Sequence, residues 1–178
     1  SSMVSGCYTY SSEVYAKTNY AGGIVGLLEA SQVQSCILNG TSKVSGSKNC
    51  IGGIVGYAKK DAQSVIAGCY VCDDARVSGI QNVGGMVGWL DTGILNQCTI
   101  SGNAVVSGSG DGVGGMVGRA VSKNGTENLF IGCRVQDDVV IEGAYSVGGI
   151  LGYAYPDSKG PVNIVNCGVL SGTIRSLS

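Results

Sequence analysis

The chain repeats one six-residue phrase, Gly-Gly-[Ile/Met]-[Val/Leu]-Gly-x, five times at nearly constant spacing. Successive copies are 30, 32, 30 and 34 residues apart, and they begin at Gly22, Gly52, Gly84, Gly114 and Gly148. A fixed period of this size indicates that one supersecondary unit is stacked on copies of itself. The repeat constrains the fold strongly, and it describes a scaffold more clearly than it describes a reaction centre.

Two further columns keep phase with the phrase. A cysteine stands 15 or 16 residues before each Gly-Gly pair, at Cys7, Cys36, Cys69, Cys98 and Cys133, and Cys167 begins a last partial unit. A β-branched residue stands seven or eight residues before each pair, at Val14, Val44, Val77, Val106 and Ile141. The apolar clusters are short, rich in β-branched residues and bounded by Gly, Asn, Asp or Ser, which is the pattern of β-strands rather than helices.

This pattern predicts an all-β fold, a β-solenoid (parallel β-helix-like) of about five coils of ~30 residues. The alternative is a propeller, but its blades need four strands and ~40 or more residues. We expect one domain over residues 1–178, with about three short strands per coil. The Cys, Val and Ile/Met columns should point inward. The phrase glycines should form corners that are too sharp for a Cβ atom or that need a positive φ.

Composition excludes several classes of protein. Glycine is abundant at 31 residues, but there are only two prolines and 44% of the residues are hydrophobic, so the chain is not a disordered linker. The net charge of −1 and the lack of a basic stripe argue against nucleic-acid binding. No apolar run approaches the ~18 residues that span a bilayer, and we expect no signal peptide among these residues. The chain opens inside a repeat, so we expect it to be a segment of a longer protein.

The Val-Gly-Gly-[Ile/Met]-Val-Gly copies, together with the Cys-x-Val and Val-x-Gly segments, resemble the GLUG-motif repeats of bacterial surface proteins. The resemblance extends from about Cys7 to Ile174. It implies an extracellular, β-rich repeat region of the kind found in adhesin-like proteins and in bacterial IgA-cleaving peptidases, outside their catalytic domains. It brings no catalytic residues to this chain.

The cysteines predict a stacked ladder of free, buried thiols rather than disulfides. Six of the eight share one repeat column, so their Cβ atoms should point the same way, which suits disulfide geometry poorly. Cys50 and Cys72 stand outside this column. Cys69-x-x-Cys72 resembles half a zinc knuckle or a redox motif, but the chain has no histidine and no second such pair, which argues against both.

Two surfaces are candidates for binding. Alternation along the phrase places Tyr57, Trp89, Arg119 and Tyr153 in one column, beside an apolar column of Val25, Val55, Val87, Val117 and Leu151. If no other part of the coil covers this face, it is an interaction patch or a flat aromatic platform for sugar rings. The second surface is the corner where loop length varies, at residues Arg119–Glu127 and Tyr155–Val162. We expect Lys123, Asn124, Pro156 and Lys159 to be exposed there.

The acidic residues give little support for catalysis or for a metal. Asp73-Asp74 and Asp137-Asp138 occupy the same position of the repeat, where other units have Asn-Gly or Gly-Asn, so turn chemistry explains them. Calcium binding by these carboxylates is the alternative. Without a histidine, a nucleophile elbow or a clear acidic cluster, we expect no enzymatic activity and no cofactor or metal.

The sequence favours a non-catalytic extracellular segment of a bacterial surface protein, acting as a rigid spacer or adhesin stalk. One alternative is a filament subunit that self-associates through its coil ends, because no cap is visible at either end of the repeat. Another is a carbohydrate-binding module that uses the Tyr57–Trp89–Tyr153 row. The expected partners are a host or cell-surface glycan or protein, with no nucleic acid and no insertion into a membrane.

Overall fold

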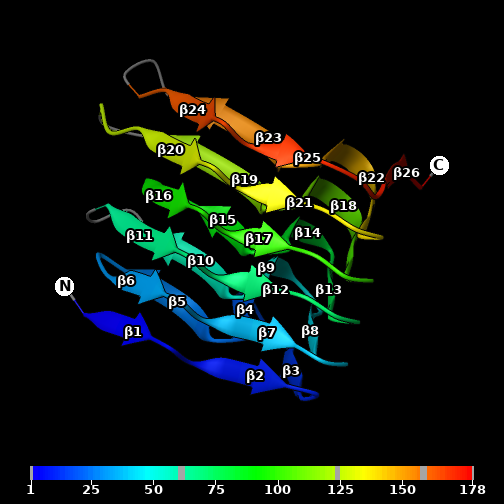
Figure 1. Ribbon diagram of the computed structural model, residues 1–178. Helices are drawn as coiled ribbons and strands as arrows, with labels where there is room; N and C mark the ends of the chain where they lie inside the picture. The colour runs from blue at the N-terminus through cyan, green and yellow to red at the C-terminus, as the bar shows by residue number, and fades with distance from the viewer. Residues whose placement is uncertain (1, 60–62, 123–124, 157–159, 178) are drawn as a thin grey trace.

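The computed structural model confirms the predicted β-solenoid. It describes residues 2–59, 63–122, 125–156 and 160–177, which form β-strands and no helix. Every strand pair is parallel and joins one coil to the next, so about five coils stack along a single axis (Figure 1). No helix in these residues is long and apolar enough to cross a membrane.

The strands form four parallel sheets, A to D, which each coil visits in that order. Sheet A contains β1 (Met3–Ser5), β6 (Gln32–Gln34), β11 (Ser64–Ala67), β16 (Gly93–Asn96), β20 (Asn128–Ile131) and β24 (Val162–Val165). Sheet B contains β2 (Tyr8–Tyr10), β7 (Ile37–Asn39), β12 (Tyr70–Val71), β17 (Thr99–Ile100), β21 (Arg134–Val135) and β25 (Gly168–Val169). Sheet C contains β3 (Glu13–Ala16), β4 (Ala21–Gly22), β8 (Lys43–Gly46), β9 (Asn49–Gly52), β13 (Arg76–Gly79), β14 (Gln81–Gly84), β18 (Val105–Gly114), β22 (Val140–Gly148) and β26 (Thr173–Ser176). Sheet D contains β5 (Val25–Glu29), β10 (Val55–Lys59), β15 (Val87–Leu90), β19 (Val117–Ser122) and β23 (Leu151–Pro156).

The expected three strands per coil is too low. Each of the first three coils has five strands, because sheet C receives two short strands from each of them. In the fourth and fifth coils these two strands join into β18 and β22. Several of the strands have only two or three residues, which is too short for an alternating pattern to be recognised in a sequence.

Sheet D is buried on both faces in the central coils. Ala58 and Leu90 are fully buried on one face, and Val55 and Val87 are fully buried on the other. Ile54 and Met86, directly before these strands, are also fully buried. The later part of sheet C in the preceding coil packs against sheet D, since β9 packs on β15 and β14 packs on β19. The valine column therefore belongs to the core, and another part of the coil covers it, as the apolar pattern on both faces requires.

The phrase glycines are required by close approach of main chain. The N–H of Gly85, in the turn between sheets C and D, donates to the carbonyl of Gly115 at 2.9 Å, so the hydrogen bonding between coils continues through the turn. A Cβ atom on Gly85 would overlap that carbonyl oxygen, and one on Gly88 would lie 2.5 Å from the main-chain nitrogen of Ile51. None of the phrase glycines has a positive φ. The steric reason expected for these glycines is thus confirmed, and the conformational reason is wrong.

The cysteine ladder forms as predicted, and all eight cysteines are free. Cys36, Cys69, Cys98 and Cys133 are fully buried, whereas Cys7 in the first coil is exposed and Cys167 in the last is half-buried. The thiols of the ladder donate weak hydrogen bonds to main-chain carbonyls, such as Cys98 to Ile66 at 3.7 Å. Contact with the thiols of Cys133 and Cys69, together with burial, holds the pKa of Cys98 well above its usual value.

The paired aspartates are turn residues that also connect coils. Asp73 and Asp137 both adopt a positive φ, at 60° and 64°, which aspartate tolerates better than most residues. Asp73 Oδ2 accepts the N–H of Gly40 at 2.9 Å, and Asp137 Oδ2 accepts that of Gly102 at 3.1 Å. Each carboxylate thus caps the corner of the preceding coil. Within the described residues, no group of three or more acidic, cysteine or histidine side chains is placed to hold a metal ion.

Replacing Gly85 with valine should destabilise the fold by about 3 kcal/mol or more, because the new side chain would overlap the next coil's main chain. Urea denaturation followed by circular dichroism would measure the loss. Gly168→Ala is the control, since a Cβ atom there meets only the Leu170 side chain at 3.7 Å. Equal stability of the Gly85→Val variant and the wild-type protein would contradict the close packing of these turns.

Thiol labelling should divide the cysteines by burial. The exposed Cys7 and the half-buried Cys72 and Cys167 should react in the native protein, and five should react only after denaturation, namely Cys36, Cys50, Cys69, Cys98 and Cys133. Maleimide labelling followed by peptide mass spectrometry would identify the modified residues. Rapid native labelling of Cys98 would show that the ladder does not face the core.

Candidate functional site

The predicted row of Tyr57, Trp89, Arg119 and Tyr153 is present on the outer side of sheet D. These residues stand directly opposite one another on β10, β15, β19 and β23. The Tyr57 and Trp89 rings have centroids 5.3 Å apart at an interplanar angle of 44°. All four side chains are half-buried. The structure therefore forms the row that the repeat predicts, as a stack along the coil axis.

Tyr20 extends the row from a different sheet. Its ring centroid lies 5.0 Å from that of Tyr57, although Tyr20 belongs to the sheet C segment of the first coil. This contact follows from the packing of each D strand on the preceding coil's sheet C segment. Tyr20 shares a repeat position with Cys50 and Asn82, and all three adopt a positive φ. The sequence shows that Tyr20 and Cys50 occupy the same column, but it does not show that this column lies beside the row.

Arg119 lies between two aromatic rings. Its guanidinium carbon is 4.6 Å from the centroid of the Trp89 ring and 5.3 Å from that of the Tyr153 ring, so both faces of the guanidinium are covered. Such cation–π contacts contribute about 0.5–2 kcal/mol each. The Nε atom is buried without a hydrogen-bond acceptor. Arg119 thus continues the stack between Trp89 and Tyr153, the aromatic residues of the two neighbouring coils.

A buried carboxylate holds one end of the row in place. Asp91 is 3% exposed and accepts hydrogen bonds from the hydroxyl of Tyr57 and the indole N–H of Trp89, each at 2.8 Å. Burial, followed by the hydrogen bond and charge of Asp91, raises the pKa of Tyr57. Burial also raises the pKa of the neighbouring Cys50 thiol to about 12. At neutral pH both groups are therefore protonated, and neither is poised to act as a base or a nucleophile.

Contacts along the row engage its aromatic side chains with one another. The Tyr57 ring lies between those of Tyr20 and Trp89, and Arg119 lies over the rings of Trp89 and Tyr153. These contacts join successive coils along sheet D. A sugar binds an aromatic side chain through an open ring face, and sugar binding by this row stays a prediction.

The variable corner differs from the expected loop. Residues Arg119 to Ser122 belong to β19 and not to a loop, and β23 extends to Pro156. Ser122 is fully buried, and its hydroxyl donates to the carbonyl of Pro161 at 2.9 Å. Lys123, Asn124 and Lys159 lie outside the described residues. The expected exposure of these side chains, and of Pro156, stays a prediction.

A buried amide, not noticed in the sequence, organises this corner. Asn128 Oδ1 accepts the N–H groups of Thr92 and Gly93 at 3.1 and 2.8 Å, and its Nδ2 donates to Ser122 Oγ at 3.1 Å. These bonds satisfy main-chain groups at the start of sheet A in the preceding coil. The repeat position of Asn128 is occupied by Ser64 and Gly93 in the two preceding coils. The sequence therefore shows a polar residue at this position, but it does not show which groups its side chain bonds to.

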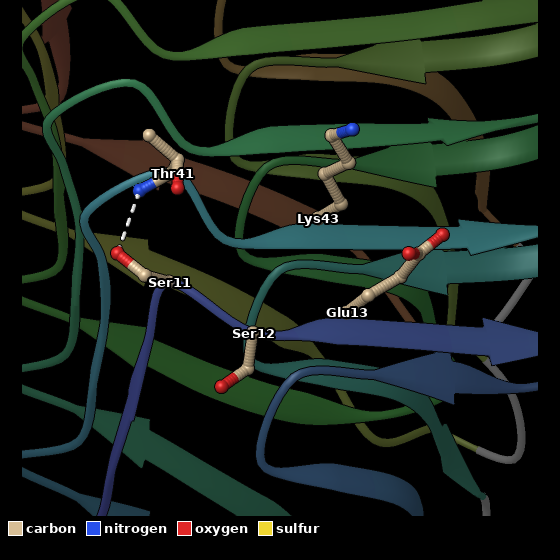
Figure 2. Close-up of a pocket in the computed structure, with 5 residues that line it drawn as sticks. All are labelled: Ser11, Ser12, Glu13, Thr41 and Lys43. Carbon is tan, nitrogen blue, oxygen red and sulfur yellow. Dashed lines mark hydrogen bonds between the residues drawn. The ribbon is translucent and has the colours of Figure 1, made fainter.

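A shallow polar hollow of about 280 Å³ lies at the corner between sheets B and C in the first two coils (Figure 2). It is lined by Ser11, Ser12, Glu13, Thr41 and Lys43. The N–H of Thr41 donates to Ser11 Oγ at 3.3 Å, across the two coils. The Glu13 and Lys43 side chains extend in similar directions from the neighbouring strands β3 and β8. No column of the repeat predicts this hollow.

The fold has a counterpart among solved structures. A crystal structure from Bacteroides ovatus, described as a "putative immunoglobulin A1 protease", superposes on 94% of this chain with a TM-score of 0.58 and 17% sequence identity. This chain spans 57% of that protein's length. At this identity, the likeness shows the fold alone. The chain matches no family model and no curated protein, so its resemblance to GLUG repeats stays a prediction.

Replacing Tyr57 with phenylalanine should lower stability by about 2 kcal/mol near neutral pH, because buried Asp91 loses a hydrogen-bond donor. The pKa of Tyr57 is raised in the folded protein, so the neutral hydroxyl stabilises the folded state. This stabilisation is complete below the pKa of ~10 that tyrosine has in the unfolded chain, and it is lost as the pH rises above that value, because the unfolded chain then ionises first. Unfolding free energies from pH 7 to pH 11 would show a shallower alkaline decline in Tyr57→Phe. Tyr20→Phe is the control, because the Tyr20 ring stacks on the same row. An identical decline in both variants would contradict the bond to Asp91.

Proposed function

We propose that the chain is a non-catalytic, GLUG-type repeat segment of a bacterial surface protein and acts as a rigid extracellular spacer or adhesin stalk. The observation that carries this proposal is the continuity of the hydrogen bonding between coils. All four sheets run along the coil axis. The turns between sheets C and D also form main-chain hydrogen bonds from one coil to the next. The B. ovatus protein with a related fold supports the proposal only through its architecture.

A solenoid of this kind suits a spacer for physical reasons. Each coil contacts only its neighbours, so stability is roughly a sum over coils, and length changes by whole units without a change of shape. Here the buried columns, the aromatic stack and the aspartate caps each connect one coil to the next. Bending the rod would have to break several of these contacts at the same time.

The positions of the acidic residues support the non-catalytic assignment. Asp73 and Asp137 cap corners of preceding coils, and Asp91 is occupied by the Tyr57 and Trp89 donors. Acid–base catalysis requires carboxyl groups that face a substrate with a tuned pKa. These three carboxylates are instead engaged in hydrogen bonds that maintain the fold.

The first experiment tests location and activity together. Antibodies raised against this segment should label intact cells of the source bacterium as strongly as permeabilised cells, and the purified segment should leave immunoglobulin A1 uncleaved. Labelling that requires permeabilisation would contradict the extracellular assignment. Cleavage of immunoglobulin A1 that persists after repurification would contradict the non-catalytic assignment.

Self-association through the coil ends is a second candidate function, and it competes with coverage of the last coil by further repeats of a longer protein. Ile164, Val169 and Ile174 are 47%, 38% and 45% exposed, whereas their counterparts one coil earlier are fully buried. A second copy stacked on this coil would cover them and pair their strands. Light scattering and negative-stain imaging across a dilution series would show filaments that shorten on dilution. A compact monomer at every concentration would exclude this function for the segment.

A further inference from the structure

The polar hollow lies where the corner between sheets B and C in the first coil is one residue shorter than in the second coil. Tyr10 pairs with Asn39, and Glu13 pairs with Lys43. Two residues therefore connect the paired strands in the first coil, where three residues, 40–42, connect them in the second. The third, fourth and fifth coils keep the longer connection, and there Asn103 Nδ2 donates to Asp74 Oδ1 at 3.1 Å from one coil to the next. In the first two coils the N–H of Thr41 instead donates to Ser11 Oγ at 3.3 Å, across the shorter connection.

The groups around the hollow are hydrogen-bonding groups available to a ligand. Ser11, Thr41, Glu13 and Lys43 are all exposed, so they offer hydroxyl, carboxylate and ammonium groups at one place. Glu13 and Lys43 are directly opposite each other on β3 and β8, yet the described structure contains no ion pair between them. Their side chains extend side by side rather than toward one another (Figure 2). Both charged groups are thus free to accept or donate hydrogen bonds to a bound molecule.

Two exposed tyrosines lie close in the sequence to residues that line the hollow. Tyr10 ends β2 beside Ser11 and is 61% exposed, and Tyr15 lies on the outer face of β3, two residues beyond Glu13, and is 57% exposed. No aromatic stacking contact joins either ring to another ring in the described residues. They differ in this from Tyr57 and Trp89, whose rings contact one another. Exposed tyrosine next to hydroxyl and charged groups offers an apolar body and a polar tip to the same ligand.

We propose that this hollow binds one sugar ring of a glycan, with Glu13, Lys43 and Thr41 bonding to its hydroxyl groups and Tyr15 or Tyr10 in contact with its apolar face. Its volume of about 280 Å³ lies at the lower limit of the roughly 300–1,000 Å³ found for small-molecule sites, which suits a single ring better than a longer ligand. The alternating hydroxyl and C–H groups of a sugar match this mixture of polar lining and tyrosine. The proposal does not depend on the segment being a surface spacer.

An amide-resolved NMR titration of the isotope-labelled chain tests the proposal. The probes are the methyl glycosides of galactose, mannose, N-acetylglucosamine and glucuronic acid, at millimolar concentrations that suit a small and shallow contact. At least one probe should shift the amides of residues 11–13 and 41–43 in a saturable manner. The glucuronide distinguishes an acidic sugar, which would use Lys43, from a neutral one.

Three variants distinguish binding in the hollow from adsorption elsewhere. Glu13→Ala and Tyr15→Ala should each weaken the binding of that probe about fivefold or more. Tyr145→Ala is the matched control, because Tyr145 is an exposed tyrosine on β22 of the same sheet, three coils beyond the hollow, and its loss should change nothing. All three positions are exposed, and an unchanged spectrum outside the hollow would confirm that each variant is folded.

The proposal is overturned if none of the four glycosides shifts the amides of the hollow. It is equally overturned if Glu13→Ala and Tyr15→Ala bind as tightly as the wild-type protein, or if the saturable shifts cluster at the Tyr57–Trp89 row instead. A failure here would leave the spacer assignment intact, because that assignment rests on the ladders between coils.

Discussion

The close contact of main chain with main chain at the Gly-Gly turns is the constraint on which the rest of the solenoid depends. At Gly85 the turn is bonded directly to the next coil, and at Gly88 the strand that follows lies against the backbone of the preceding coil. Neither position has room for a Cβ atom. Because the chain can fold back this sharply, sheet D lies on sheet C, and apolar side chains on both of its faces are buried.

The aromatic row is a consequence of the same packing. Each D strand rests on the sheet C segment of the coil before it, which brings Tyr20 to Tyr57 and places the row at the seam between the two sheets. Asp91 then bonds to the two ring donors that would otherwise be half-buried without a partner. A surface that resembles a ligand platform in the sequence is therefore part of what joins the coils. Exposed tyrosines without a ring contact, Tyr10 and Tyr15, lie elsewhere, in the first coil.

Much of the fold is predictable from the repeat, because a fixed period identifies which residues are neighbours in adjacent coils. It correctly places the cysteine ladder, the buried Ile/Met and Val columns and the aspartates at turns. The period does not reveal contacts between different columns, such as Tyr20 with Tyr57 or Asn128 with Thr92, because these depend on the angle at which the sheets meet. The hollow lies at a corner that is one residue shorter than in the second coil, and a change of one residue in the period does not predict a hollow.

Amide hydrogen exchange resolved to single residues would show whether the Gly-Gly turns belong to the hydrogen-bonded ladder between coils or are loops on its surface. The N–H groups of Gly53, Gly85 and Gly115 should exchange as slowly as that of Val87 in the adjoining strand, since all four donate to the next coil. Exchange of the three glycine amides at the rate of an open surface turn, while the strand amides stay protected, would contradict the account.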